Sequence, residues 1–153
     1  MSDTTLLNLD GFFPYQLAKL QAIISDSIAE IYTGEFDLSR QEWRILAILA
    51  NKKLMSAKNI GLKANLEKMP TSRAIKKMLE RELLKKANNT QDKRSSLLTL
   101  TKQGESLYHQ LAPLVLQRER ELISVLNKQE LAVLKSSFAK LEIKALQSVI
   151  SKT

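Results

Sequence analysis

The stretch Ser56 to Lys77, SAKNIGLKANLEKMPTSRAIKK, decides the fold expected for this chain of 153 residues. Ser56 can cap a helix over Ala57 to Ala64, because its hydroxyl can accept a hydrogen bond from a backbone amide that lacks an intrahelical partner. After a brief turn, Pro70 suits the first position of a second helix, where a missing amide proton costs little. Two short helices joined by a turn predict a helix-turn-helix motif.

The second of these helices has two unlike faces. At steps of three and four residues, one face carries side chains suited to packing: Thr71, Ile75, Met78 and Leu79. The opposite face carries polar and basic side chains: Ser72, Arg73, Lys76 and Lys77. One face can therefore pack on the domain while the other is free to read DNA.

Basic residues concentrate in and after this helix. The range Lys68 to Lys102 holds ten of the 24 basic residues and three of the 16 acidic ones, in a chain of net charge +8. Such a cluster is typical of a polyanion site, because each neutralised phosphate releases condensed counterions. Charge alone leaves open whether the cluster binds DNA or is only a solvated surface.

A hairpin is predicted after the second helix. Leu83 to Ala87 and Leu97 to Leu100 form its strands, and the polar run between them is rich in turn-forming residues. Its tip carries Asp92, Lys93 and Arg94. Arg94 is expected to enter the minor groove of DNA, where narrow A·T-rich tracts concentrate negative potential. Asp92 either orients that arginine or caps the turn.

Long helices flank this central region. On the N-terminal side, apolar residues at steps of three and four predict a helix over Phe12 to Tyr32, which Gly34 ends. Ser39 and Glu42 have the spacing of a capping box, in which each side chain bonds the backbone amide of the other residue. They open a predicted helix from Arg40 to about Asn51.

Two further helices are predicted on the C-terminal side. Thr101 caps the first, over Lys102 to Val125, which we expect to be interrupted or bent at Pro113. Asn127 and Glu130 form a second capping box and open the final helix.

Both ends of the chain carry the apolar side chains that a seam between helices requires. They are Leu6, Leu7, Phe12 and Phe13 near the start, and Leu131, Leu134, Phe138 and Leu141 in the final helix. We therefore predict a single, mainly α domain of the α+β type. In it, residues 1–36 and 102–153 form a dimerisation region and residues 37–101 a DNA-binding lobe.

Three segments, in the expected order and spacing, resemble the MarR family of bacterial regulators. They read LSRQEWRIL at 38–46, KMPTSRAIKK at 68–77 and DKRSSLLTLTKQG at 92–104. The reading helix of the family often runs like K-M-T-V-S-R-A-V, and its wing carries D-x-R before a strand that ends in L-T-x-x-G. The resemblance covers about residues 10 to 150. It implies a winged helix-turn-helix whose first and last helices interlock in a homodimer, on a pseudo-palindromic site in double-stranded DNA.

The chain departs from the family pattern at two positions. Glu82 stands where the family usually has the glycine that turns the reading helix into the strand, so we expect a different turn there. Pro70 stands where the family often has a hydroxyl residue that can contact phosphate.

The residues expected to contact DNA have different roles. Arg73 is the first choice as base reader, because a guanidinium can bond guanine through two donors; a phosphate contact or an ion pair with Glu80 is the alternative. The flexible charges of Lys76 and Lys77 suit phosphates. The full reading-helix set is Pro70, Thr71, Ser72, Arg73, Lys76 and Lys77, and Ser56 and Lys58 are candidates for the DNA backbone.

An effector pocket is a further expectation. The resemblance implies a small aromatic or phenolic ligand between the dimerisation helices and the DNA-binding lobe, where Tyr15, Phe36 and Trp43 could line a pocket. The alternative is that these aromatic residues are simply core. His109 has no partner at helical spacing that would make a metal site, so we expect a packed or partly exposed histidine.

Other classes of function find little support. The chain has no cysteine, which excludes thiol chemistry and disulfides, and it lacks the common catalytic and phosphate-loop motifs. It has no signal-like start and no apolar run of about 18 residues. We expect a cytoplasmic regulator, not an enzyme, that uses no cofactor, metal or membrane and acts as a sequence-specific repressor. The alternative is an architectural protein that binds DNA without sequence preference.

Overall fold

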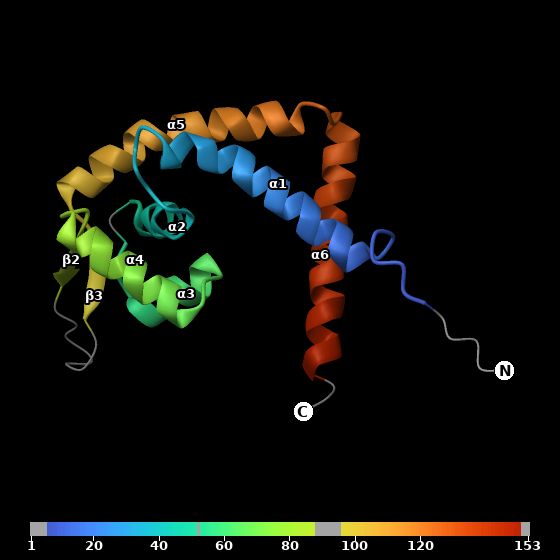
Figure 1. Ribbon diagram of the computed structural model, residues 1–153, viewed down its shortest axis with the longest axis horizontal. Coiled ribbons are helices and arrows are strands. Elements are labelled where there is room, and N and C mark those ends of the chain that lie inside the picture. Colours follow the sequence, from blue (N-terminus) through green and yellow to red (C-terminus); the bar gives the residue numbers. More distant parts are fainter. Residues whose placement is uncertain (1–5, 52, 88–95, 151–153) are drawn as a thin grey trace. The chain divides into compact units, whose positions relative to one another are not determined.

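The two helices predicted between Ser56 and Lys77 are present in the computed structural model, which describes residues 6–51, 53–87 and 96–150 (Figure 1). They are α3 (Ala57–Ala64) and α4 (Lys68–Glu80). The other elements, in chain order, are α1 (Phe13–Thr33), α2 (Arg40–Leu49), β1 (Met55–Ser56), β2 (Leu84–Ala87), β3 (Leu97–Leu100), α5 (Lys102–Ile123) and α6 (Lys128–Ile150). The fold is a mainly helical winged helix-turn-helix, as predicted.

The strands form one small antiparallel sheet in the order β1, β3, β2. Leu84 on β2 pairs with Leu100 on β3, and Met55 on β1 pairs with Leu98 on the other side of β3. The predicted hairpin is therefore present. We did not predict β1, because two residues are too few to show the alternation that marks a strand.

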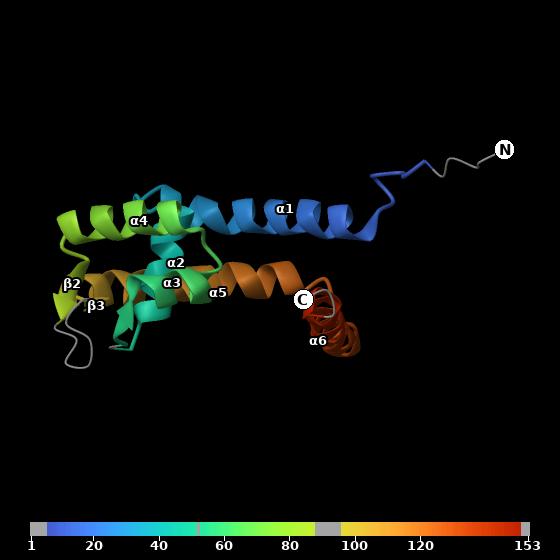
Figure 2. The same ribbon diagram turned by 90° about the horizontal axis from the view of Figure 1, so that it is seen from below.

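Helices α2, α3 and α4 contact one another in pairs (Figure 2). Their inward side chains form one core with residues of α1, α5 and the sheet. The fully buried members include Ile45, Leu46, Leu49, Ile60, Met78 and Leu111. Close packing of this kind fixes the orientation of α4, because a helix that packs against two other helices and a strand cannot tilt without opening voids.

The start of α4 differs from the prediction. The helix begins at Lys68 with Glu67 as the residue before it, so Pro70 is the third helical residue and not the first. Proline is tolerated there for the same physical reason, since the first four amides of a helix have no partner inside the helix.

The turn from α4 into β2 is also a correction. Glu82 adopts the left-handed conformation, with φ of 56°, that a glycine takes without cost. The chain therefore keeps a left-handed turn at the position where we expected a different one. Glutamate pays for this conformation with backbone strain of about 1 to 2 kcal/mol.

Thr101 joins the two ends of the hairpin. Its hydroxyl donates to the carbonyl oxygen of Glu82 at 2.6 Å, and its amide donates to that of Leu83 at 3.1 Å. The same hydroxyl accepts a hydrogen bond from the Gly104 amide at 3.0 Å and so caps α5, as predicted. A side chain at Gly104 would collide with the Leu83 carbonyl, which gives the glycine of the L-T-x-x-G motif a steric reason.

The chain divides into two compact units, residues 1–116 and 117–153. In the second unit, α6 opens with the predicted capping box: Asn127 Oδ1 accepts from the Glu130 amide, and a carboxylate oxygen of Glu130 accepts from the Asn127 amide, both at 2.8 Å. Helix α5 runs continuously through Pro113, so of the two expected effects of this proline, an interruption or a bend, the interruption is absent. None of the helices in the described ranges is both long and apolar enough to cross a bilayer.

Candidate nucleic-acid interface

Helix α4 presents the two faces that its sequence predicts. Its buried residues are Thr71, Ala74, Ile75 and Met78. Its exposed residues include Lys68, Met69, Ser72, Arg73 and Lys76, so the outward face is largely basic. Among the described residues, Arg73 makes no ion pair, and the alternative pairing with Glu80 is not found. Its guanidinium is therefore available to a ligand.

Thr71 does not belong to the outward face, which corrects its place among the DNA-contacting candidates. It is only 3% exposed, and its hydroxyl donates to the Glu67 carbonyl oxygen at 2.7 Å. It also lies against Gly61, where a Cβ atom would come within 3.3 Å of the Thr71 hydroxyl oxygen. Thr71 thus helps α3 and α4 approach each other closely, and its side chain is used for packing.

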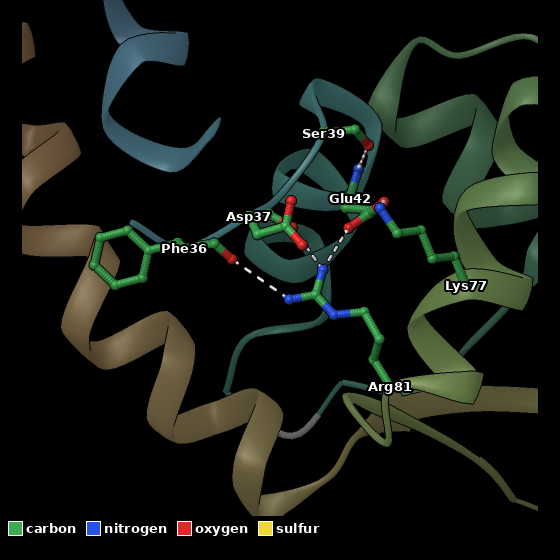
Figure 3. A network of polar contacts seen from close by, with 6 residues as sticks. All are labelled: Phe36, Asp37, Ser39, Glu42, Lys77 and Arg81. Carbon is green, nitrogen blue, oxygen red and sulfur yellow. Dashed lines mark hydrogen bonds and ion pairs between the residues drawn. The ribbon is translucent and has the colours of Figure 1, made fainter. Parts of the chain in front are cut away.

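Glu42 is the centre of a polar network that holds α4 against α2 (Figure 3). Its side chain is 2% exposed. Lys77 Nζ lies 3.1 Å from one carboxylate oxygen, and Arg81 Nη1 donates to the other at 3.2 Å. Lys77 lies in the last turn of α4 and Arg81 directly follows the helix, so the buried carboxylate holds the C-terminal end of α4 through two cations.

Arg81 extends this network to the loop before α2. Its Nη1 also donates to the Asp37 carbonyl oxygen at 2.6 Å, and its Nη2 donates to the Phe36 carbonyl oxygen at 3.4 Å. One guanidinium therefore joins α4, α2 and the connection from α1, as Figure 3 shows. A planar fork with several donors suits such a junction, because each acceptor can be met without bending the others away.

The role of Glu42 corrects the capping box predicted at the start of α2. Ser39 accepts from the Glu42 amide at 3.2 Å, as expected. The carboxylate of Glu42 turns to Lys77 and Arg81 instead. A signal for this was present, since Glu42 falls in helical phase with the buried Ile45, Leu46 and Leu49. Its partners could not be found, because they lie more than thirty residues further along the chain.

Lys77, which we predicted to contact a DNA phosphate, forms an ion pair within the protein. Its side chain is 51% exposed but pairs with Glu42. Lys76, one residue earlier, is exposed and makes no ion pair within the described ranges. Lys76 is therefore the better candidate for a phosphate contact on this helix.

Two grooves border the outward face of α4. The larger, of about 530 Å³, runs between α3 and α4, and its lining includes Lys58, Leu62, Lys68 and Ser72. The smaller, of about 300 Å³, lies between α2 and α4, and Pro70, Arg73 and Lys77 contribute to it. Ser56 accepts from the Asn59 amide at 3.2 Å and caps α3, as predicted, while Lys58 remains exposed. Basic side chains therefore border both grooves.

A separate ion pair joins α1 to α2. Arg40 Nη2 lies 2.7 Å from Asp26 Oδ1. A hydrogen bond with the Tyr32 side chain raises the pKa of the Arg40 guanidinium, with burial opposing the shift and Asp26 adding to it. Arg40 therefore stays charged and holds the N-terminus of α2 to α1.

The hairpin tip stays a prediction. Asp92, Lys93 and Arg94 lie outside the described residues.

The three aromatic residues of the expected effector pocket do not share one place. Trp43 is stacked between Tyr32 and Tyr108, with ring centroids 6.0 and 6.4 Å apart. Phe36 packs on the same core. Tyr15 lies about 25 Å from Tyr32 along α1, at 1.5 Å per residue, under the ammonium group of Lys19.

His109 meets the edge of Tyr108, and no group of three or more metal-binding side chains occurs in the described part of the chain.

The residues expected in the dimer seam have little cover within one chain. Leu6, Leu7, Phe12, Phe13, Leu134, Phe138 and Leu141 are exposed, and Leu131 is half-buried. Helix α6 has no buried residue at all. Apolar area of this extent is unusual on a monomer that remains alone in water.

Comparison with known proteins was made for the sequence and for the fold. The model of the MarR family matches residues 38–96, the region from α2 through α4 to β2. A comparison with curated protein sequences gives no significant match. The solved structure of the MarR/EmrR family transcriptional regulator from Acinetobacter sp. ADP1 is similar, with 27% identity and a TM-score of 0.81, over 92% of this chain and 99% of that one.

Two similar structures were solved with ligands. NadR in complex with 4-hydroxyphenylacetate is 19% identical, with a TM-score of 0.71, over 92% of this chain and 96% of that one. PcaV from Streptomyces coelicolor, in complex with its natural ligand, is 18% identical, with a TM-score of 0.74, over 92% of this chain and 98% of that one. At these identities the likeness concerns the fold.

Proposed function

We propose that this chain, which the MarR family model matches over residues 38–96, is a regulator of that family and represses transcription by binding a pseudo-palindromic operator as a homodimer. The observation that carries the proposal is the outward face of α4. It is basic, it includes Arg73, which makes no ion pair within the described residues, and the C-terminal end of the helix is held on a buried carboxylate by Lys77 and Arg81. Such a regulator acts on the chromosome, in the cytoplasm.

Arg73 and Lys76 on α4 have different proposed roles, which follow from the chemistry of their side chains. Arg73 can bond guanine through two donors at the major-groove edge and so encodes sequence. Lys76 is a flexible point charge and positions the protein on phosphates without encoding sequence. Arg94 of the hairpin would reach the adjacent minor groove, and Lys58 would contact the backbone from the groove between α3 and α4.

The homodimer rests on the exposed apolar residues of the terminal segments. Covering the side chains named above would remove a large apolar area from water, at about 25 cal/mol per Å². Two reading helices related by a two-fold axis would meet major grooves about 34 to 36 Å apart, which is why the operator should be an inverted repeat.

A small aromatic or phenolic effector would release the operator. The similar structures of NadR and PcaV, both with bound ligands, support a ligand-responsive fold. A ligand can shift the dimer between two geometries only by its difference in affinity for them, so it must bind the form whose reading helices are wrongly spaced. The stacked Tyr32, Trp43 and Tyr108 lie at the junction of α1, α2 and α5 and would border such a site.

Selection from random duplex DNA tests the proposal directly. We expect the purified protein to enrich an inverted repeat with half-sites one helical turn apart. Binding should weaken steeply with salt, because several phosphates are neutralised at once. Enrichment of no motif, with equally tight binding to all duplexes, would instead establish an architectural protein. Repeating the selection with 4-hydroxyphenylacetate, the ligand of NadR, tests the effector arm.

A further inference from the structure

Met69 is an exposed apolar side chain on an otherwise basic surface. It is the second residue of α4, and 61% of it is exposed. It takes no part in the hydrophobic core. The exposed residues that surround it on the helix are polar or charged: Lys68, Ser72, Arg73 and Lys76.

Helical phase puts Met69 opposite the packed side of α4. At about 100° per residue, the exposed residues from Lys68 to Lys76 cover one half of the helix, and Met69 lies near the middle of that half. The buried residues occupy the other half. Met69 also lies in the first turn, which is the part of a reading helix that meets base edges. Arg73 follows one turn later on the same face.

The chemistry of the major groove offers Met69 one matching group. Base edges there present hydrogen-bond donors and acceptors, apart from the C5-methyl group of thymine. A thioether side chain has only a weak acceptor, and its three rotatable bonds let it adapt to an apolar neighbour. Phosphates and water would leave this side chain without a favourable contact, whereas a thymine methyl would bury both apolar surfaces.

We propose that Met69 packs on a thymine methyl in each half-site and so makes thymine the preferred base beside the one that Arg73 reads. The proposal rests on the proposed function and adds a second reading residue to it. Four residues of helix rise by about 6 Å, and base pairs are about 3.4 Å apart. The thymine is therefore expected within about two base pairs of the base that Arg73 contacts.

Removal of single methyl groups from the DNA tests this contact. The duplex that the wild-type protein selects is remade with deoxyuridine in place of each thymine in turn, which removes the methyl and keeps the base pairing. At one position near the Arg73 base, the wild-type Kd should rise about fourfold, the value of one buried methyl. Replacement in both half-sites should raise it roughly fifteenfold.

A variant identifies the residue responsible. Met69→Ala should bind the thymine and deoxyuridine duplexes equally well, because the side chain that detects the methyl is gone. Leu54→Ala is the matched control: Leu54 is also apolar and 52% exposed, but it lies outside α4, just before β1. It should keep the wild-type sensitivity to deoxyuridine. Both side chains are exposed, so both variants should fold, which circular dichroism checks.

The outcomes separate this proposal from the one on which it rests. If a motif is selected but no deoxyuridine position changes the Kd, Met69 does not read thymine, while sequence-specific binding stands. If the sensitivity persists in Met69→Ala, another residue reads the methyl and the proposal is wrong. If no motif is selected at all, the proposed function fails, and the reading role of Met69 fails with it.

Discussion

Glu42 is a buried carboxylate whose two oxygens each pair with a cation at the C-terminal end of α4, one with Lys77 in the helix and one with Arg81 just after it. Removing one partner of a buried ion pair destabilises a protein by more than the pair itself contributes, because the remaining charge stays buried with neither its partner nor water to compensate it. Arg81 also satisfies two backbone carbonyls, of Phe36 and Asp37. Much of the stability of the lobe should therefore depend on this single arginine.

We expect Arg81→Met to lower the free energy of unfolding by about 2 to 3 kcal/mol, since it leaves Glu42 with Lys77 alone and frees both carbonyls. Urea unfolding followed by circular dichroism measures the change. Lys76→Met is the matched control, because Lys76 is an exposed cation on the same helix, and it should change stability by less than about 0.5 kcal/mol. Equal losses in the two variants would contradict a structural role for Arg81.

Glu82 offers a prediction of the opposite sign. Its φ of 56° is strained for glutamate and relaxed for glycine, so Glu82→Gly should raise the free energy of unfolding by about 0.5 to 1 kcal/mol. Thermal unfolding would show a higher midpoint. Asn65→Gly is the control, since Asn65 has a φ of 52° that asparagine already tolerates, and we expect almost no change there. A destabilised Glu82→Gly protein would show that the side chain contributes more than its strain costs.

At the scale of elements, α4 has one packed side and one exposed, basic side, which we propose contacts DNA. We expect Arg73→Ala to cost about 1 to 3 kcal/mol of binding to the selected operator and to relax the preference at one base position. Lys76→Ala should weaken binding to all duplexes alike and lower the slope of log K against log salt by about one. Fluorescence anisotropy on specific and scrambled duplexes measures both effects.

The comparison uses Lys76 because Lys77 has two roles. Lys77→Ala would remove a partner of Glu42 as well as a surface charge, so its effect on DNA would be mixed with an effect on the position of α4. If Arg73→Ala and Lys76→Ala lower the affinity for every sequence by the same factor, the assignment of Arg73 as base reader is wrong.

The sequence predicts an element well when the interactions that form it lie between residues close together in the chain. The bounds of α3 and the caps at Ser39, Ser56 and Thr101 follow from neighbouring residues, and all are present. Strand β1 exists only because it pairs with β3, more than forty residues away. The carboxylate of Glu42 likewise turned from a local cap to partners on another helix. The caps at these three residues were therefore predicted from neighbouring residues, whereas the pairing of β1 with β3 and of Glu42 with Lys77 and Arg81 was not.

At the scale of the whole molecule, the apolar surface of α6 is the feature that requires an explanation. We expect the double variant Leu134→Asn, Leu141→Asn to shift the protein from dimer to monomer, because both side chains are exposed and lie two turns apart on one face. Sedimentation equilibrium measures the mass. The control is Lys135→Asn, Glu142→Asn, which changes exposed residues about a quarter turn away and should leave a dimer. A double variant that stays fully dimeric would place the seam elsewhere.

Sequence alone predicts the positions of site residues within one helix better than the approach of residues from different helices. Residues on both faces of α4 could be assigned from helical phase alone, and that phase already put Thr71 on the packed face, against its inclusion among the DNA contacts. The effector pocket required three aromatic residues to converge, and helical rise separates Tyr15 from the other two. Periodicity orders residues around a helix, but it does not say which helices meet.

The bonds of Thr101 have a consequence for how this protein could be diversified. Hydrogen bonds from Thr101 to Glu82 and Leu83 join the start of β2 to the end of β3. We therefore expect that the segment between Ala87 and Leu97 can be replaced by another sequence without loss of the sheet. A longer or differently charged insert would add only about 0.6 kcal/mol of closure entropy for each doubling of its length. Replacing this segment with the hairpin tip of another winged protein should leave the midpoint of urea unfolding nearly unchanged and alter only DNA binding.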